Sequence, residues 1–381
     1  MGLQRAAIYT HRYDHIEETM MKREAGFSLI ELLITMVIMG FVLTLGSDMF
    51  VGLLRGYKQQ SKITETNIEG IVALELLRRD IASAGYGLPW SLSTAYNEAT
   101  NAVAAVYNDS PTNSPPRAIV SGDNITAAGY VNGSDYLVIK AVNLAQNDTC
   151  TKWTILPNTG IASSWTPTSE NLATTDRVIL ISPGSTAANS RTLVASGIFS
   201  AMTALSSDET SVIYGVAPAD ANPLWMPFNR ADYYVKTTGI TIPGRCASGT
   251  GVLYKAIVDQ SGGGFSGNVF PLFDCIADMQ VSYDLDRNGD GTISNTVVLN
   301  DLLGTPLTAQ QLRDQLKVVR VYILAHEGQR DDNYTNPTNP ILVGQSAPLG
   351  RNFDLSSLAD PKWQHYRWKV YSLIVRPNNL R

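Results

Sequence analysis

The sequence contains little charge and few histidines. Charged residues make up 17% of the 381 positions, and the net charge at pH 7 is -5. Without an excess of basic residues, nothing indicates nucleic acid or anionic lipid as the main partner. The four histidines are scattered, at His11, His15, His326 and His365. Two of them lie near the N-terminus, and the other two do not make a catalytic centre.

Motifs of common enzyme active sites are also missing. The patterns G-x-S-x-G and H-E-x-x-H do not occur, and there is no phosphate-binding loop. The glycines at 262–264 have no lysine behind them, so this run is interpreted as a flexible loop. The six tryptophans are expected in the core or at strand edges. The sequence therefore predicts a protein that is not an enzyme and has no organic cofactor.

One long apolar run is present, from Phe27 to Ser47, with Glu31 as its single charge. As a helix it would be roughly 31 Å long, which matches the hydrocarbon thickness of a bilayer. Lys22 and Arg23 precede it and are expected to stay cytoplasmic, which places the rest of the chain outside. Three alternatives are a secretory signal peptide, a plain membrane anchor and a buried core helix. The absence of an A-x-A site argues against a signal peptide, and the carboxylate argues against a plain anchor. The length of the nearly uncharged run argues against a buried core helix.

The start of this run, Gly26-Phe27-Ser28-Leu29-Ile30-Glu31, resembles the processing motif of type IV prepilins and of type II secretion pseudopilins. The resemblance implies cleavage after Gly26 and N-methylation of Phe27 by a prepilin peptidase. Residues 1–26 would then be a leader, with translation starting at Met20 or Met21. A carboxylate inside a bilayer is costly and is usually functional. Glu31 is therefore expected to meet the new amine of an incoming subunit; a Glu that snorkels at the membrane edge is the alternative.

The helical pattern continues beyond the membrane-length run and ends at the Gly85–Pro89 stop signal. We expect one helix with a transmembrane or filament-core part, residues 27–55, and an amphipathic part, residues 56–85. The second part has a broad apolar face formed by Ile63, Ile68, Ile71, Val72, Leu74, Leu77 and Ile81.

Residues 86–381 are expected to form a β-rich head outside the cytoplasm. Residues 90–133 are interpreted as loops with short strands. Later strands are predicted at Tyr136–Val142, Arg177–Ser182, Arg191–Ala195, Tyr233–Thr237, Gly251–Ile257, Ile276–Asp284, Val318–Ala325 and Tyr366–Val375. Thr308–Gln311 reads as a capping box that opens a short helix. The predicted fold class is α+β, a type IV pilin fold with a long N-terminal helix packed on a mostly antiparallel sheet.

Three head segments, 76–87, 275–283 and 366–376, resemble minor pilins of the PilW type. Similar pieces occur in the J-type pseudopilin of type II secretion, which is the nearest alternative. The resemblance implies a low-copy subunit that primes assembly of a type IV pilus or sits at its tip. Implied partners are the prepilin peptidase, other minor and major pilins, and the inner-membrane assembly platform. The implied location is the inner membrane as a single-pass protein, and then the pilus at the cell surface.

One loop has the spacing of a cation site. From Asp286, oxygen donors recur at Asn288, Asp290, Thr292 (by its carbonyl) and Ser294, with Gly291 at the turn, as in the first part of an EF-hand loop. The residue at the twelfth position is Val297 instead of Glu, so Asp284 or Asp301 is the expected source of a further oxygen. The hypothesis is one Ca²⁺ ion and, as a third possible function, a calcium-dependent adhesive head. An acidic turn without metal is the alternative.

The three cysteines are Cys150, Cys246 and Cys275, and the absence of a C-x-x-C pair argues against a zinc site. In an oxidising compartment an odd number allows at most one intramolecular bridge. Cys246 precedes one predicted strand and Cys275 opens another, so adjacent antiparallel strands would bring the two together. We expect the Cys246–Cys275 disulfide with Cys150 free; Cys150 in place of either one is the alternative.

Overall fold

The computed structural model describes residues 26–110, 114–184, 190–205, 209–220, 223–265, 267–298 and 306–380. The expected leader up to residue 25, with both candidate start sites Met20 and Met21, lies outside the described residues, as does Asp301. The chain divides into two compact units, residues 1–57 and 58–381. One helix, α1 (Leu29–Ser83), contributes residues to both.

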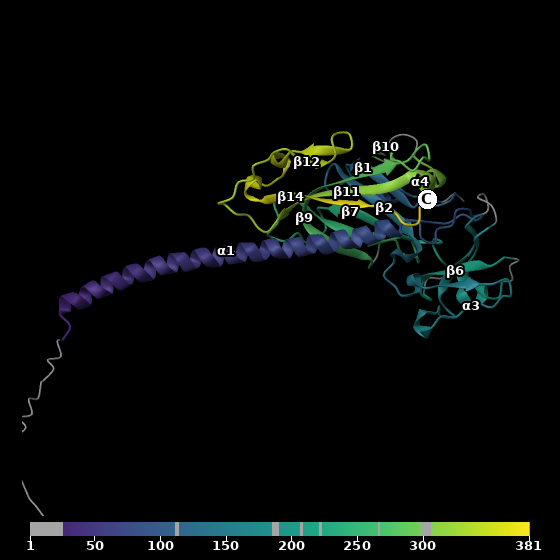
Figure 1. The fold of residues 1–381 in the computed structure, drawn as a ribbon, viewed down its shortest axis with the longest axis horizontal. Coiled ribbons are helices and arrows are strands. Elements are labelled where there is room, and N and C mark those ends of the chain that lie inside the picture. Colours follow the sequence, from purple (N-terminus) through teal and green to yellow (C-terminus); the bar gives the residue numbers. More distant parts are fainter. Residues whose placement is uncertain are drawn as a thin grey trace, which may run out of the picture. The chain divides into compact units, whose positions relative to one another are not determined.

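The described part of the first unit is the beginning of α1 (Figure 1). The Ser28 hydroxyl accepts a hydrogen bond from the Ile30 N–H at 3.3 Å. This bond satisfies one of the N–H groups that have no partner within the first turn of a helix. Apolar side chains are exposed along the whole segment, with Phe27, Leu29 and Leu45 more than two-thirds exposed. By length and composition this helix could cross a membrane. A continuous apolar surface of this kind requires apolar surroundings.

The second unit is built on an eight-stranded sheet whose strand pairs are all antiparallel. The strand order is β1-β2-β7-β8-β9-β11-β14, and β10 pairs with β9. Side chains of β11 alternate, with Val319, Val321 and Ile323 in the core, because successive residues of a strand face opposite sides. The bounds are β1 Ile119–Ile125, β2 Ser134–Ala141, β7 Asn229–Lys236, β8 Gly251–Ile257, β9 Val269–Leu285, β10 Asn295–Val297, β11 Leu316–Glu327 and β14 Arg367–Val375.

The second half of α1 packs on this sheet. Its buried residues recur every three or four positions, as expected for one face of a helix: Thr66, Gly70, Ala73, Leu77, Asp80 and Ile81. Gly70 permits a close approach, since an added Cβ would lie 3.0 Å from the ring of Phe273. The buried Asp80 accepts a hydrogen bond from the Tyr233 hydroxyl at 2.7 Å and lies 2.5 Å from the Lys255 Nζ. Polar side chains thus help to hold this helix on its sheet.

The predicted apolar face of this half-helix is wrong for Ile68, Ile71 and Val72, which are 57%, 65% and 54% exposed. The buried stripe is rotated away from them because it contains two polar residues, Thr66 and Asp80, that find partners on the head. The buried face was predicted from the apolar side chains alone. That prediction did not include the partners of Thr66 and Asp80 on the head. Leu77 and Ile81 are buried as predicted.

The start of β2 contacts β9, although β7 and β8 lie between these two strands in the sheet order. The Asp135 carboxylate accepts hydrogen bonds from the backbone N–H groups of Asn124 at 2.8 Å and Val281 at 2.6 Å. The Gln280 side chain donates to the carbonyl of Gly133 at 2.9 Å. Burial raises the pKa of Asp135 well above its usual value. The bonds from Val281 and Gln280 connect β9 to the β1–β2 hairpin, which is not its neighbour in the sheet order.

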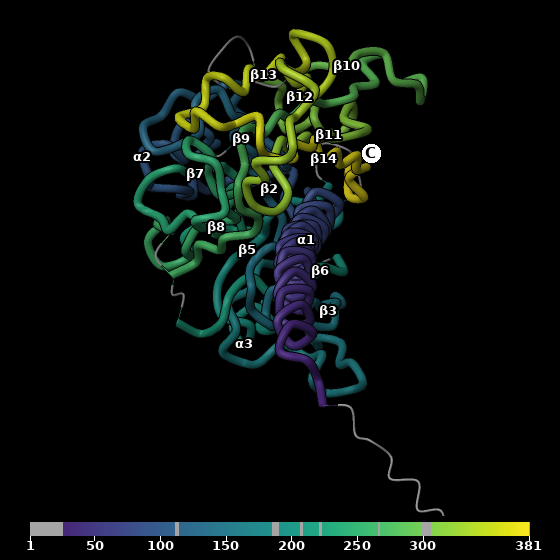
Figure 2. The backbone as a smooth tube through the Cα atoms, turned by 90° about the vertical axis from the view of Figure 1, so that its left-hand side faces the viewer, coloured from purple at the N-terminus to yellow at the C-terminus, as the bar shows by residue number. Residues whose placement is uncertain are grey.

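Two smaller sheets flank the large one. A four-stranded sheet, ordered β3-β6-β4-β5, is inserted between β2 and β7, which pair directly with each other. Figures 1 and 2 both show it, with β6 and α3, as a separate layer of the head. The hairpin β12–β13 lies over β9 and β11 and covers a second small core. The bounds are β3 Trp153–Leu156, β4 Arg177–Ser182, β5 Thr192–Ile198, β6 Ser211–Ala217, β12 Ile341–Gly344 and β13 Gly350–Phe353, with short helices α2 Ala102–Ala105, α3 Phe199–Met202 and α4 Ala309–Gln315.

The α+β class, with a long N-terminal helix and an antiparallel head, is confirmed. All eight predicted strands are strands in the structure, with ends shifted by a few residues and β9 extended to begin at Val269. The capping box is confirmed too: the Thr308 hydroxyl accepts from the Gln311 N–H at 3.2 Å, and the Gln311 side chain accepts from the Thr308 N–H at 2.9 Å. The strands β1, β3, β6, β10, β12 and β13 were not individually predicted.

Candidate functional site

The expected processing and assembly residues lie together at the start of α1. Gly26 and Phe27 precede the helix, and Glu31 is in its first turn. The Glu31 Oε2 accepts a hydrogen bond from the Ser28 N–H at 3.1 Å. An anion is favoured there, because the first N–H groups of a helix are unpaired and the helix dipole is positive at this end. The carboxylate is therefore held at Ser28, which would be the second residue of a chain that begins at Phe27.

The expected cation loop follows β9. The Asp286 carboxylate accepts hydrogen bonds from the N–H groups of Gly289 at 2.7 Å and Gly291 at 3.0 Å. Both glycines have positive φ, 75° and 86°, which this tight turn requires. Asp290 accepts from the Thr292 N–H at 2.7 Å and the Asn288 amide at 2.8 Å, and the Thr292 bonds hold the pKa of Asp290 below its usual value. The loop thus keeps its curvature through its own hydrogen bonds.

Three of the expected cation ligands have other partners, and one of them, Asp286, lies 3.7 Å from the Lys317 Nζ in an ion pair. The Asp284 carboxylate forms an ion pair with the Arg320 guanidinium at 2.7 Å and accepts a hydrogen bond from the Thr296 hydroxyl at 2.8 Å. The Ser294 hydroxyl donates to the carbonyl of Leu285 at 3.1 Å and accepts from the Arg287 N–H at 2.8 Å. Asp286, Asn288, Asp290 and the Thr292 carbonyl are oxygen donors of the type that Ca²⁺ takes. The calcium site stays a prediction, and Asp284 and Ser294 are engaged by other groups.

The structure joins Cys246 to Cys275 in a disulfide and leaves Cys150 as a buried thiol. The sulfurs and a ring nitrogen of His326 lie within 4.8 Å of one another. Since both sulfurs are used in the disulfide, this group is not a metal site in the oxidised head. Burial lowers the pKa of His326 to about 3, so its imidazole is neutral and accepts a hydrogen bond from the Ala247 N–H at 2.9 Å.

Sequence reasoning missed a buried ionic network under β2 and β7. The Lys140 Nζ lies 2.7 Å from the Glu98 Oε2, and the Arg230 Nη1 lies 2.9 Å from the same oxygen. Arg230 also pairs with Asp232 at 2.8 Å, and Asp232 accepts from the Tyr136 hydroxyl. Buried charges require partners of this kind. The only feature of the sequence that indicated this network was a lysine within the apolar strand Tyr136–Val142. The partners of that lysine come from distant segments of the chain.

Comparison with known proteins gives two family matches. Residues 21–47 match the family described as Prokaryotic N-terminal methylation motif. Residues 232–379 match the family described as Type IV Pilus-assembly protein W. The resemblance to type IV pilins of the PilW type is confirmed. A PilW-type pilin with a methylation motif implies other pilins and a processing peptidase as its partners in general.

The PilW match covers the C-terminal part of the head. It runs from β7 to the residues after β14 and includes both disulfide cysteines and the hairpin β12–β13. The inserted sheet β3–β6 lies outside it. Among solved structures, a type IV-like pilin from Thermus thermophilus aligns with 82% of this chain and 97% of its own, at 12% identity and a TM-score of 0.29. No curated protein matches the chain.

Proposed function

We propose that the protein is a minor type IV pilin, a low-copy structural subunit that primes assembly of a pilus or sits at its tip. The observation that carries the proposal is Glu31, the single charge in the apolar run at the start of α1, directly behind the methylation motif. The PilW match of the head supports the minor rather than the major role. A structural role agrees with the pilin family and requires no catalytic residues.

In the proposed mechanism the peptidase cuts between Gly26 and Phe27 and methylates the new amine. The amine of one subunit then pairs with the Glu31 carboxylate of its neighbour, where low polarity strengthens the attraction. The intramolecular bond from the Ser28 N–H supports this arrangement, because it already holds Glu31 at the first turn. The exposed Ile68, Ile71 and Val72 add apolar surface on the head's own part of α1 that neighbouring helices can cover.

The proposed topology places the N-terminus in the cytoplasm and the head in the periplasm, as a single-pass inner-membrane protein. Lys22 and Arg23 support this orientation, because basic residues stay on the cytoplasmic side. From there the subunit engages other minor and major pilins and the inner-membrane assembly platform. Assembly into the filament moves the head to the cell surface.

The experiment combines N-terminal mass spectrometry with quantification in sheared pili. We expect the mature protein to begin at methylated Phe27 and to occur in pili far below the major pilin. Deleting the gene should reduce the number of pili, and restoring it should recover them. An N-terminus near Asp48, or normal piliation without the protein, would contradict the proposal. Co-purification with a secretin-linked secretion complex instead of pili would favour the J-type pseudopilin.

A second candidate, a calcium-dependent binding head, is favoured by one observation. The Asp286 carboxylate already wraps the backbone of Gly289 and Gly291 into a loop that presents further oxygen donors. A pilus subunit at the cell surface would meet millimolar calcium, which suits sites of low affinity. Binding of the full chain to surfaces or glycans in calcium and in chelator would test it, and equal binding in both would contradict it.

A further inference from the structure

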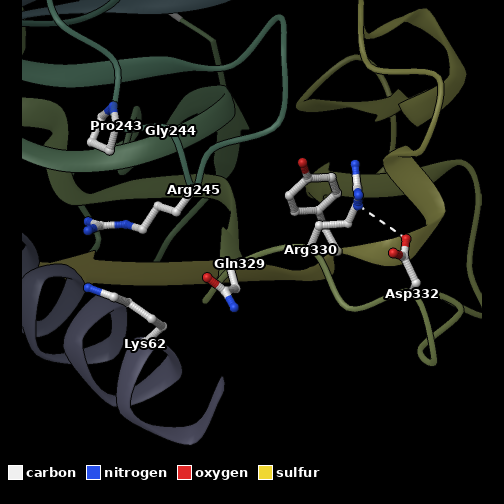
Figure 3. A pocket seen from close by; sticks show the side chains of 8 residues that line it. Lys62, Pro243, Gly244, Arg245, Gln329, Arg330 and Asp332 are labelled. Carbon is white, nitrogen blue, oxygen red and sulfur yellow. Dashed lines mark ion pairs between the residues drawn. The ribbon is translucent and has the colours of Figure 1, made fainter. Parts of the chain in front are cut away.

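Two cavities in the second unit differ in what they offer to a ligand. The first lies next to the second half of α1, and its cations Lys62, Arg245 and Arg330 are each already paired with a carboxylate. Figure 3 shows one of these pairs, Arg330 with Asp332. The second cavity, of about 410 Å³, is lined mainly by residues at and after the ends of β2, β6 and β8. None of the described residues that line it is a lysine, an arginine or a histidine, so it has no cation to hold an anion.

Two buried amides bring the segments around the second cavity together. Asn229, which is 1% exposed, donates from its Nδ2 to the carbonyls of Val142 at 2.6 Å and Val216 at 3.0 Å. Its Oδ1 accepts from the Nε2 of Gln260 at 3.2 Å, and Gln260 also donates to the Phe228 carbonyl at 2.6 Å. The residue after β2, the end of β6, the start of β7 and the segment after β8 are thus joined at one place. The cavity is formed before any ligand binds, as is usual for binding sites.

The lining of this cavity combines apolar and polar groups. Ala217, Ile257 and Val258, which are at most 4% exposed, form its apolar part. The side chains of Gln146 and Asn268 line it as well and have no hydrogen-bond partner among the described residues. Each of these two amides can therefore serve a ligand with its N–H donors and its carbonyl acceptor.

Three further side chains of the lining keep hydrogen-bonding capacity. Asn147 accepts from the Cys150 N–H through its Oδ1 at 2.9 Å, which leaves its NH₂ group for a ligand. Asp259 accepts from the N–H of Ser261 at 3.0 Å and from its hydroxyl at 2.6 Å, one on each oxygen, and each oxygen keeps a lone pair. The exposed Asp220 has no partner among the described residues. Amide donors and carboxylate acceptors thus line the same cavity.

We propose that this cavity binds a neutral saccharide. A sugar hydroxyl both donates and accepts hydrogen bonds, so a ring with several hydroxyls can serve the amide donors and the carboxylate acceptors at once. The C–H groups of the ring can cover the apolar part. An anion would meet two carboxylates and no cation, a cation would leave the amide N–H groups without acceptors, and an apolar ligand would leave every polar group unsatisfied.

The position of the cavity makes it particular to this chain. Gln146 and Asn147 follow β2, where the inserted sheet leaves the large sheet, and Asp220 precedes its return at β7. These residues lie outside the PilW match, whereas Asp259 and Asn268 lie inside it. The insert and the common head thus each contribute part of the lining. The site requires neither the proposed pilin role nor the calcium loop.

The test uses the full chain in a detergent whose headgroup is not a sugar, with a chelator present. The probes are glucose, galactose and mannose, each compared with its uronic acid and its 2-amino sugar at neutral pH. Titrations followed by saturation-transfer NMR should show saturable binding of at least one neutral sugar. Its two charged counterparts should bind about tenfold more weakly or less.

Three variants connect this binding to the cavity. Gln146→Ala/Asn268→Ala removes two amides that have no other partner among the described residues, so the melting temperature should stay the same. Sugar binding should become about tenfold weaker or more, because hydrogen bonds to the ligand are lost. Asn158→Ala/Gln310→Ala, the matched change at exposed positions outside the cavity, should leave binding unchanged. Asp220→Asn keeps an oxygen acceptor but removes a charge, so it should retain the neutral sugar and strengthen binding of the uronic acid.

Each other outcome overturns a defined part of the proposal. Unaltered sugar binding by Gln146→Ala/Asn268→Ala would place the sugar elsewhere and remove the site. Tighter binding of an amino sugar or a uronic acid than of the neutral sugar, or no binding of any neutral sugar, would remove the ligand class. Because a chelator is present and no filament is involved, these results are independent of the calcium loop and of the pilin role.

Discussion

The Nη2 of Arg245 donates to the Glu69 carboxylate of α1 at 2.6 Å and to the Asp274 carboxylate of β9 at 3.1 Å. Arg245 and Asp274 each directly precede a cysteine of the disulfide. The covalent bond and the ion cluster therefore share two short stretches of backbone, residues 245–246 and 274–275. Through them the disulfide positions the loop that contacts the second half of α1.

Replacing both disulfide cysteines, Cys246→Ala/Cys275→Ala, should destabilise the head by about 3–4 kcal/mol, since the bond closes a loop of 29 residues. Urea denaturation of the detergent-solubilised chain measures this. The control is Cys150→Ser, which retains a donor for the Ala145 and Asn147 carbonyls that the thiol now contacts. Peptide mapping that links Cys150 to another cysteine, or an unchanged denaturation midpoint in the double variant, would refute the assignment.

Glu31→Ala should block entry into pili while membrane insertion remains intact. Removing a charge from the apolar part of α1 makes insertion easier, because a carboxylate is costly in a bilayer. Alkaline extraction of membranes checks insertion, and immunoblots of sheared pili check assembly. The matched variant Thr35→Ala removes a hydroxyl bonded only within the helix, to the Leu32 carbonyl, and should assemble normally. Wild-type amounts of the alanine variant in pili would remove the assembly role of Glu31.

Calcium at 10 mM should stabilise the chain by about 1.4–2.7 kcal/mol if the Asp286 loop binds it with a dissociation constant of roughly 10⁻⁴–10⁻³ M. Thermal unfolding in calcium and in chelator measures the shift. Asp290→Asn should abolish it. The control is Asp354→Asn, since Asp354 also accepts from a backbone N–H two residues on, but the alternating oxygen donors stop after Ser356, because the next position at this spacing is Leu358. The same shift in both variants, or none in the native chain, would reduce the cluster to an acidic turn.

Asp278 should make the stability of the head depend on pH. Burial raises the pKa of Asp278 to about 6, although Arg351, whose Nε lies 2.8 Å from the carboxylate, opposes the change. Because the folded pKa is raised, this contribution to stability is complete below pH ~4 and is lost as the pH rises through ~6. The neighbouring Asp135 has a raised pKa for the same reason.

Between pH 4.5 and 7.5 the native chain should therefore lose about 2 kcal/mol more stability than Asp278→Asn. Urea denaturation at the two pH values measures this difference. The absolute stability of the variant is not the readout, because the change also removes a partner of Arg351. Equal pH dependence in both chains would show that Asp278 stays ionised when folded.

The sequence was most informative where one pattern extends over many residues. The apolar run from Phe27 predicted the helix, and period-two alternation predicted β11, because each signal repeats along the segment that folds. Short strands such as β3 and β12, of four residues each, offer too few repeats for the same reasoning. The motif Gly26–Glu31 could be recognised from the sequence for another reason, because its residues are adjacent in the chain.

Sites built from distant segments were much less accessible. Glu98, Lys140 and Arg230 meet only after the large sheet has formed, and none of them stands out in its local sequence except the lysine. The cation loop shows the same limit on a smaller scale. Its spacing suggested Asp284 as a ligand, whereas pairing of β9 with β11 brings Arg320 to that carboxylate.

The inserted sheet leaves the large sheet after β2 and returns at β7, and these two strands pair directly. Its two attachment points are therefore fixed by hydrogen bonds that do not involve the insert. A change in the length or sequence between them need not alter the register of the main sheet. This position suits the grafting of a foreign domain or epitope, and it gives related proteins a place to diverge while the common scaffold stays the same.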